Sequence, residues 1–315
     1  MGIPSRRHFV KACRNIEFTW RYLFNLAPTL AYQFGRHSLS GEAARVLATL
    51  NRDGVAITTV DRLFGQSACY DELQSNVDRL EREDLAEEIA ALRANSDASA
   101  AIGHKTFIFP LLGDYPLFDP GTIYARFGLQ KPILRIANAY FGMYTRLRYY
   151  NVWHTFATQA EARESQLWHR DREDYLILKV FVYLSDVDES AGPFTYAVGS
   201  HPKGQLRPEP AYFLEGAVKR SRDEQMAAVA PRERWMKCVG PKGTIIFADT
   251  RGYHKGGEAR GRDRIMYTCM FTSPASQSEE FLRRNGEVPV SPDKELAFAL
   301  AAPRQAPRLS WRAGN

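Results

Sequence analysis

The chain has 315 residues, of which 44% are hydrophobic and 25% charged, with a formal net charge of +6 at pH 7. This composition provides enough apolar material for a packed core and excludes a largely disordered protein. Residues 1–37 hold six Arg and Lys against one acid, residues 303–315 hold three against none, and residues 38–302 are slightly acidic. Because the excess positive charge lies in the tails, a basic nucleic-acid groove in the folded body is disfavoured.

The four cysteines stand far apart and form no C-x-x-C pair. This spacing excludes a disulfide framework and a zinc ribbon, and it is typical of a protein in a reducing cytoplasm. The length exceeds that of a plain barrel without requiring two domains. We therefore predict a cytoplasmic protein with one elaborated domain at 41–302, a basic helical extension at 1–40 and a flexible tail at 303–315.

Residues 18–34 form the most apolar stretch of the extension, but Arg21 and Pro28 interrupt it. The stretch is shorter than the roughly 20 apolar residues that span a bilayer. The interruptions also argue against a signal peptide. We expect a helical tail that lies on the body of the protein. The alternative is a peripheral membrane contact through the Arg, Trp20 and Phe side chains of residues 1–37.

Up to residue 143 the pattern is mainly helical. Apolar residues at helical spacing, Gly and Asn stops and Glu-rich polar faces predict several short elements. They are a helix at 41–50 with a turn at 51–54, a strand at 55–60, a helical region at 70–95 that breaks near Asp84, a polar break at 95–101, an ordered loop at 104–121 and a helix at 131–143.

After residue 143 the pattern changes to strands. Five β-branched and aromatic runs are bounded by Gly, Pro, Asp or Ser, at 145–153, 175–184, 193–198, 243–250 and 264–272. No helical stretch separates them until 208–236. Strands that follow one another in this way are typical of an antiparallel sandwich or barrel rather than a doubly wound sheet.

The sequence His169-Arg-Asp171 places an imidazole and a carboxylate two residues apart, and His254 follows at the end of a later strand. Residues i and i+2 of a strand point to the same face, so the first two side chains can meet at one point. Two histidines and one carboxylate can hold Fe(II) and leave positions open for a cosubstrate and oxygen. A lone H-x-D pattern is also common around histidines with a purely structural role.

The pieces around this motif decide between these interpretations. In order, they are WHRD at 168–171, YLSDV at 183–187, SAGP at 190–193, VGSHPKG at 198–204, GPKG at 240–243, IIFAD at 245–249 and then His254. In order and spacing the chain resembles the phytanoyl-CoA dioxygenase family of Fe(II)- and 2-oxoglutarate-dependent oxygenases. The resemblance covers roughly residues 145–273, and residues 50–55 match the family pattern more weakly. It implies a mainly β protein with added helices around a double-stranded β-helix, the cupin-like jelly roll.

The resemblance also implies a ligand set. His169, Asp171 and His254 would bind Fe(II), with 2-oxoglutarate and O2 as cosubstrates. An Arg ten or eleven positions after the distal histidine pairs with the far carboxylate of 2-oxoglutarate in this family, and Arg264 stands at ten. A guanidinium suits that role because it is planar, always charged and able to bind a carboxylate through two hydrogen bonds.

Several nearby residues remain secondary. Arg260 and Arg262 lie in a charged turn and are expected to face solvent. Some relatives carry a hydroxyl residue two positions after the distal histidine, where this chain has Gly256. His154 and His201 are expected to be structural.

Three residues on the strands are further candidates for cosubstrate binding. Asn151 and Tyr149 lie on one face of the strand before the metal motif, where the family often places cosubstrate contacts. Lys179 lies in the middle of a strand and either points to solvent or faces a carboxylate inside the barrel, because a buried lysine needs a counter-charge.

The function implied is hydroxylation, or another oxidation, of an unactivated C–H in a small-molecule, lipid or carrier-bound substrate. Asp171 supports this chemistry, since halogenating relatives have a small residue at that position. Two alternatives are a non-catalytic jelly roll that binds a ligand or membrane, and a cupin-type metal enzyme independent of 2-oxoglutarate. The loops at 97–130 and 205–236 are expected to shape substrate access, and the sequence leaves substrate and oligomeric state open.

Overall fold

The computed structural model describes residues 16–96, 106–206, 219–276, 280–285 and 291–302. The predicted tail at 303–315 and the first fifteen residues of the extension lie outside these ranges. So do residues 97–105 and 207–218, which belong to the two loops expected to shape substrate access.

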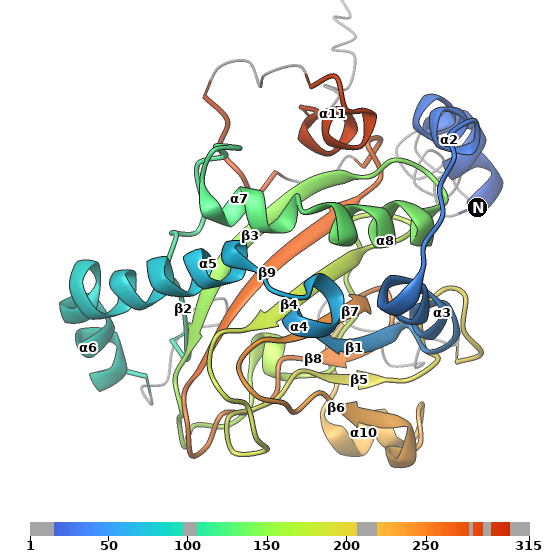
Figure 1. The fold of residues 1–315 in the computed structure, drawn as a ribbon. Helices are drawn as coiled ribbons and strands as arrows, with labels where there is room; N and C mark the ends of the chain where they lie inside the picture. Colours follow the sequence, from blue (N-terminus) through green and yellow to red (C-terminus); the bar gives the residue numbers. More distant parts are fainter. Residues whose placement is uncertain (1–15, 97–105, 207–218, 277–279, 286–290, 303–315) are drawn as a thin grey trace, which may run out of the picture.

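Two antiparallel sheets form the centre of the molecule (Figure 1). The larger sheet has the order β1-β7-β4-β9-β3-β2, and the smaller has the order β6-β5-β8. The strands are β1 (Val55–Thr59), β2 (Ile108–Pro110), β3 (Arg146–Thr155), β4 (Leu178–Tyr183), β5 (Thr195–Ala197), β6 (Trp235–Lys237), β7 (Thr244–Asp249), β8 (His254–Lys255) and β9 (Arg264–Thr272). The expected β core with added helices is confirmed.

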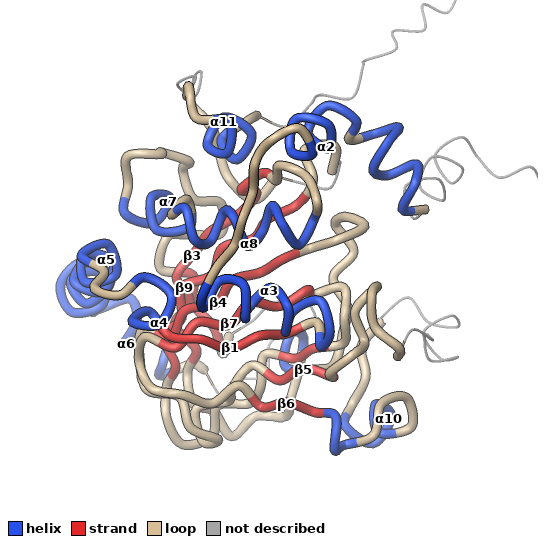
Figure 2. Tube along the Cα trace, turned by 45° about the vertical axis from the view of Figure 1, so that its right-hand side comes forward, coloured by secondary structure: helices blue, strands red, loops and turns tan. Residues whose placement is uncertain are grey.

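Helices lie outside the sheets, and several cover one face of the larger sheet (Figures 1 and 2). They are α2 (Leu26–Gln33), α3 (Gly41–Asp53), α4 (Val60–Phe64), α5 (Ala68–Arg79), α6 (Ala86–Ala94), α7 (Ile123–Gly128), α8 (Lys131–Phe141), α10 (Asp223–Ala227) and α11 (Lys294–Leu300). Short π-helical turns lie at η1 (Thr19–Phe24) and η2 (Leu80–Asp84), and 3-10 turns at η3 (Glu164–Gln166) and η4 (Arg232–Arg234).

The central strands are buried on both faces, so their side chains divide by the two-residue period. In β4, Leu178, Val180 and Val182 pack against the helices, whereas Phe181 and Tyr183 pack between the two sheets. Each fully buried apolar side chain of this kind contributes roughly 1.5–3 kcal/mol. The same alternation turns polar residues at the intervening positions of β4 and β9 into the space between the sheets.

The helical region at 70–95 breaks where the sequence predicted. Helix α5 passes into η2, which ends when the Leu85 N–H donates to Leu80 O at 2.8 Å, and α6 starts at Ala86. The loop expected at 104–121 instead contains the short strand β2, and α7 was not predicted. Strand β2 pairs only with β3 at the edge of the sheet, where its Pro110 is tolerated, so its local composition is that of a loop.

Gly54 ends α3 and starts β1 in a left-handed conformation, with φ of 80°. A side chain at this position would also collide with the Tyr196 hydroxyl and the His201 ring. The turn predicted at 51–54 therefore requires glycine both for its backbone angle and for the close approach of the smaller sheet.

A histidine between two carboxylates joins the helical layer to the larger sheet. His154 of β3 contacts Glu81 of η2 through Nδ1 and Asp263 through Nε2, each at 2.6 Å. Burial opposes the charged imidazole, but the hydrogen bonds to Asp263 and Glu81 outweigh it and raise the pKa of His154. Asp263 also pairs with Arg93 and accepts from the Ala157 N–H. The expected structural role of His154 fits these contacts.

We predict that His154 stabilises the fold in its protonated form. Because its pKa is raised on folding, the stabilisation is complete below the unfolded pKa of about 6.5 and is lost as pH rises through the folded value. His154→Gln should cost about 2 kcal/mol at pH 6 and clearly less at pH 9. Urea unfolding of both proteins at the two pH values measures this, and a pH-independent difference would contradict it.

Candidate metal centre

His169, Asp171 and His254 come together between the two sheets. One ligand atom from each residue lies within 4.8 Å of the others. The two histidine Nε2 atoms lie 3.9 Å from different oxygens of Asp171. The imidazole centroids are 4.3 Å apart. This geometry brings two nitrogen donors and one carboxylate to a single point.

Backbone pairing produces this arrangement. His169 and His254 form an antiparallel bridge, with N–H···O distances of 2.9 and 3.0 Å in the two directions. The Asp171 N–H donates to Thr250 O at 2.9 Å, which is a separate main-chain hydrogen bond to the segment just before His254. Residues 85 positions apart in the sequence are therefore held opposite each other by main-chain hydrogen bonds.

Both histidines are held with Nε2 free to bind a metal. The Nδ1 atom of His169 lies 2.8 Å from Leu167 O, and that of His254 lies 3.0 Å from Gly252 O. Since a carbonyl can only accept, each Nδ1 carries the proton and each Nε2 keeps its lone pair. Burial lowers the pKa of both residues, and for His169 the neighbouring His254 lowers it further. Neutral imidazole is the form that binds metals.

Lys179 faces Asp171, which is the carboxylate alternative of the two expected from the sequence. Its Nζ atom lies 2.6 Å from Asp171 Oδ2. Burial would raise the pKa of Asp171, but Lys179 and the two histidines hold it well below its usual value. Burial would likewise lower the pKa of Lys179, but Asp171 and Glu173 raise it. The carboxylate is therefore ionised and ready to act as a ligand.

A cavity of about 160 Å³ adjoins His169 and His254. Its walls are largely aromatic and apolar, and they include Phe107, Ile108, Trp153, Phe181, Phe194 and Met266. The strand alternation anticipates Phe181 and Met266, which share faces with Lys179 and Arg264. No sequence signal marks Phe107 and Ile108, because they reach the cavity from the unexpected strand β2 and the residue before it.

Arg264 lines the same cavity as a buried cation. Its Nη1 donates to Gly256 O at 2.8 Å and also to Gly192 O, while its Nε has no hydrogen-bond partner. Among the described residues no carboxylate pairs with it. Thr268, on the same face of β9, also lines the cavity, and its buried Oγ1 has no partner. An anionic ligand would satisfy these groups.

Tyr149 and Asn151, the remaining candidates for cosubstrate binding, differ in their position relative to the cavity. Tyr149 lines the cavity, and burial raises the pKa of its hydroxyl. Asn151 does not reach the cavity: its Nδ2 donates to Gly113 O at 2.8 Å, and its Oδ1 accepts from the Leu112 and Val152 N–H groups. The Asn151 amide therefore holds the turn after β2.

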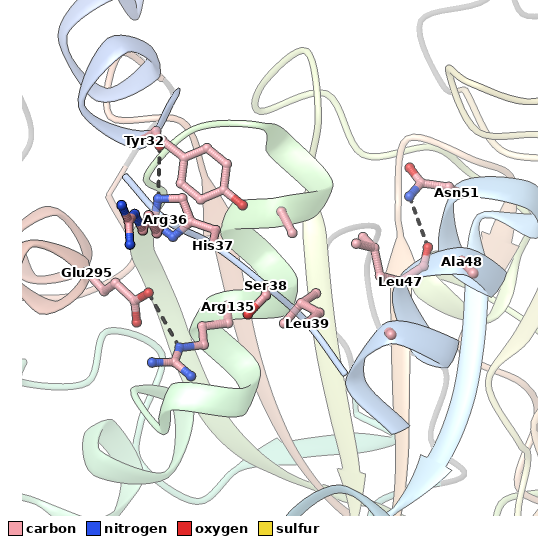
Figure 3. Close-up of a pocket in the computed structure, with 12 residues that line it drawn as sticks. Tyr32, Arg36, His37, Ser38, Leu39, Leu47, Ala48, Asn51, Arg135 and Glu295 are labelled. Carbon is pink, nitrogen blue, oxygen red and sulfur yellow. Dashed lines mark hydrogen bonds and ion pairs between the residues drawn. The ribbon is translucent and has the colours of Figure 1, made fainter. Parts of the chain in front are cut away.

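A larger cavity lies away from the cluster of His169, Asp171 and His254. A cavity of about 430 Å³ lies between the end of α2, α3, α8 and Glu295 of α11 (Figure 3). Its charged groups satisfy one another in part, since Arg135 Nε lies 3.6 Å from Glu295 Oε1. His37 Nε2 lies 2.9 Å from Tyr32 O. None of His169, Asp171 and His254 lines this cavity.

Two histidines and one carboxylate are the ligand set typical of mononuclear non-heme Fe(II) oxygenases. Residues 122–266 match the model of the family described as phytanoyl-CoA dioxygenase. The resemblance seen in the motifs is thus confirmed over these residues, which make up a little under half of the chain and are similar to this family of Fe(II)- and 2-oxoglutarate-dependent oxygenases. None of the curated proteins compared with the chain matches it.

Two solved structures of EctD support the fold. EctD from S. alaskensis in its apoform is 17% identical, with a TM-score of 0.50 over 80% of this chain and 85% of that one. The same protein with bound Fe is 16% identical, with the same TM-score and the same coverage of both chains. The non-heme alpha ketoglutarate dependent epimerase SnoN from nogalamycin biosynthesis is 16% identical, with a TM-score of 0.45 over 74% and 83% of the two chains. At these identities the likeness concerns the fold alone.

The Lys179–Asp171 pair predicts a specific stability change. Lys179→Met should destabilise the metal-free protein by about 3 kcal/mol, because it leaves the buried Asp171 carboxylate without its cation. Lys237→Met, which removes the exposed pair with Glu189, is the matched control and should cost less than about 1 kcal/mol. Urea unfolding compares the two, and equal losses would contradict the role given to Lys179.

Proposed function

We propose that His169, Asp171 and His254 bind Fe(II) and that Arg264 binds the far carboxylate of 2-oxoglutarate. The observation that carries the first part is the three-residue cluster, with both Nδ1 atoms bonded to carbonyls and one ionised carboxylate. The second part is supported by a buried guanidinium in the adjoining cavity that has no carboxylate partner in the described part of the chain.

Each residue of the proposed site then has a distinct role. The bound iron, with 2-oxoglutarate as the electron source, supplies the activation of O2. His169 and His254 present fixed lone pairs, and Lys179 keeps the Asp171 carboxylate ionised before metal arrives. Arg264 orients the cosubstrate through a charge-assisted contact. Trp153, Phe181, Phe194 and Met266 exclude water from the reacting centre.

We propose that the reaction is hydroxylation, or another oxidation, of an unactivated C–H in a small-molecule, lipid or carrier-bound substrate. The aromatic lining supports an apolar group at the reacting carbon, because such walls offer it contact area without hydrogen bonds. Tyr149, at the cavity wall, is a candidate for contact with cosubstrate or substrate. The Asn151 amide is already hydrogen-bonded elsewhere, so we leave it out of the proposed site.

The cysteines support the cytoplasmic location predicted from the sequence. Within the described ranges, Cys69, Cys238 and Cys269 are all free thiols. Cys238 and Cys269 are buried, and burial raises the pKa of the Cys269 thiol to about 12, which keeps it protonated and unreactive. Free thiols of this kind are typical of a reducing compartment.

Metal binding tests the ligand set. Anaerobic titration with Mn(II), followed by isothermal calorimetry, should give one site per chain in the wild type. His169→Ala and Asp171→Ala should lower its affinity at least about 100-fold, since each removes one of three protein ligands. His201→Ala is the matched control, because His201 contacts Asn51 O rather than the cluster. Unchanged affinity in the two ligand variants would exclude this site.

Steady-state kinetics tests the cosubstrate site. Arg264→Met should raise the KM for 2-oxoglutarate at least about tenfold, since it removes a charged contact worth roughly 1.5–3 kcal/mol. Arg262→Met is the control, because Arg262 is exposed and pairs with Asp188. Succinate formation is the readout. A larger effect in Arg262→Met would move the site, and metal binding without any succinate would favour the non-catalytic jelly roll.

A further inference from the structure

Exposed apolar side chains concentrate in one short segment. Of the ten large hydrophobic residues that are exposed in the described ranges, seven lie within residues 16–34: Ile16, Phe18, Tyr22, Leu23, Leu26, Leu30 and Phe34. Isolated exposed hydrophobics are ordinary on protein surfaces, whereas a contiguous group marks an interaction site. We call these seven residues the outer face.

The outer face extends over two consecutive helical pieces, η1 and α2, which are separated by the non-helical Asn25. Tyr22 follows Phe18 by four residues before the break, and Leu30 and Phe34 follow Leu26 at the same interval after it, a spacing that places side chains on one side of a helix. The rings of Phe18 and Tyr22 lie 5.4 Å apart, so neighbours in the row touch. Phe34 is 86% exposed and Phe18 is 70% exposed, so both project fully into solvent.

The opposite side of the same segment is firmly docked on the body. Trp20 is buried, and its Nε1 donates to Asp174 Oδ1 at 2.7 Å. Asn25 is buried as well, and its Oδ1 accepts from the Ala275 N–H at 3.0 Å. Arg21 donates to Phe141 O at 2.7 Å. These contacts hold the segment in one orientation, so the residues of its outer face remain exposed to solvent.

The charge next to the outer face is positive. Residues 1–37 carry six basic residues and one acid, and that acid, Glu17, pairs with Arg21. Arg36 is exposed two residues beyond Phe34, and within the described ranges it forms no ion pair with an acidic side chain. The fifteen residues that precede the segment in sequence add Arg6, Arg7, Lys11 and Arg14 and no acid.

We propose that the outer face docks on the surface of a membrane that contains anionic lipids, with the segment lying in the plane of the interface. An apolar stripe beside basic charge fits this partner, because the stripe enters the acyl boundary while the cations meet lipid phosphates. Stable attachment generally needs two such signals together. No helix in the described ranges is long and apolar enough to cross a bilayer.

The position of the segment favours a lipid surface over a protein groove. Both views show α2 on the outside of the molecule, near α11 and at the opposite end from β6 of the smaller sheet (Figures 1 and 2). An exposed row of Phe, Leu and Tyr can enter a soft interface without a complementary cavity. A second copy of the chain would bring the positive charge of residues 1–37 against itself, which opposes self-association.

Vesicle flotation with the full chain tests the proposal. The protein should bind vesicles of equal parts phosphatidylcholine and phosphatidylserine, and bind pure phosphatidylcholine at least about tenfold more weakly. The double variant Leu26→Glu/Leu30→Glu should reduce binding at least about tenfold, because it places two charges on the stripe. Arg36→Glu should reduce binding about fivefold or more and weaken its dependence on salt.

The matched control is Leu117→Glu/Val239→Glu, two substitutions at residues of similar exposure outside the segment. It should bind as the wild type does. Leu23→Ser/Phe34→Ser replaces the first pair if that variant loses its thermal unfolding transition. His169→Ala should also bind the vesicles as the wild type does, because His169 is not part of the outer face. A failure of the membrane proposal can therefore be told apart from a failure of the iron assignment.

Three outcomes would overturn the proposal. The first is no binding of the wild type to either vesicle at low salt. The second is an equal loss in the control pair. The third is a concentration-dependent dimer in sedimentation equilibrium that Leu26→Glu/Leu30→Glu abolishes, which would assign the outer face to a second copy of the chain.

Discussion

The main-chain bridge between His169 and His254 is the interaction on which the centre depends. It joins the segment before β4 to the strand β8, and it sets two imidazoles side by side before any metal is bound. A further main-chain hydrogen bond, from the Asp171 N–H to Thr250 O, holds the residue that adds the carboxylate. Because hydrogen bonds of the backbone rather than of the side chains hold the three residues in place, both Nε2 atoms and the carboxylate remain available as ligands.

The electrostatics of the cavity follow from burial. A charge buried between two sheets needs a partner of opposite charge. The two buried cations of the cavity differ in whether the chain supplies that partner. Lys179 and Asp171 compensate each other at 2.6 Å. Within the described part of the chain Arg264 donates to neutral oxygen atoms alone, so its charge is left for a ligand to balance. One cation thus prepares the ligand set, and the other creates a demand for an anion beside it.

The helical additions serve a different purpose from the sheets. They bury one face of the larger sheet and, through Glu81 and His154, tie the helical layer to β3. The N-terminal segment extends this layer outward while its Trp20 contacts Asp174, three residues from Asp171. The candidate metal centre and the outer face of the N-terminal segment therefore share a scaffold but occupy separate regions.

The sequence by itself determined six of the strands (β1, β3, β4, β5, β7 and β9), the break near Asp84, the resemblance to the oxygenase family and the residue types brought together at 169, 171 and 254, because motif spacing and strand alternation are local properties. The tertiary structure alone decided which inward positions reach the cavity. Tyr149 reaches it, whereas Asn151 bonds to the turn at 112–113. Whether Lys179 met solvent or a carboxylate, and how β2 joined the edge, likewise depended on partners distant in sequence, which no local pattern encodes.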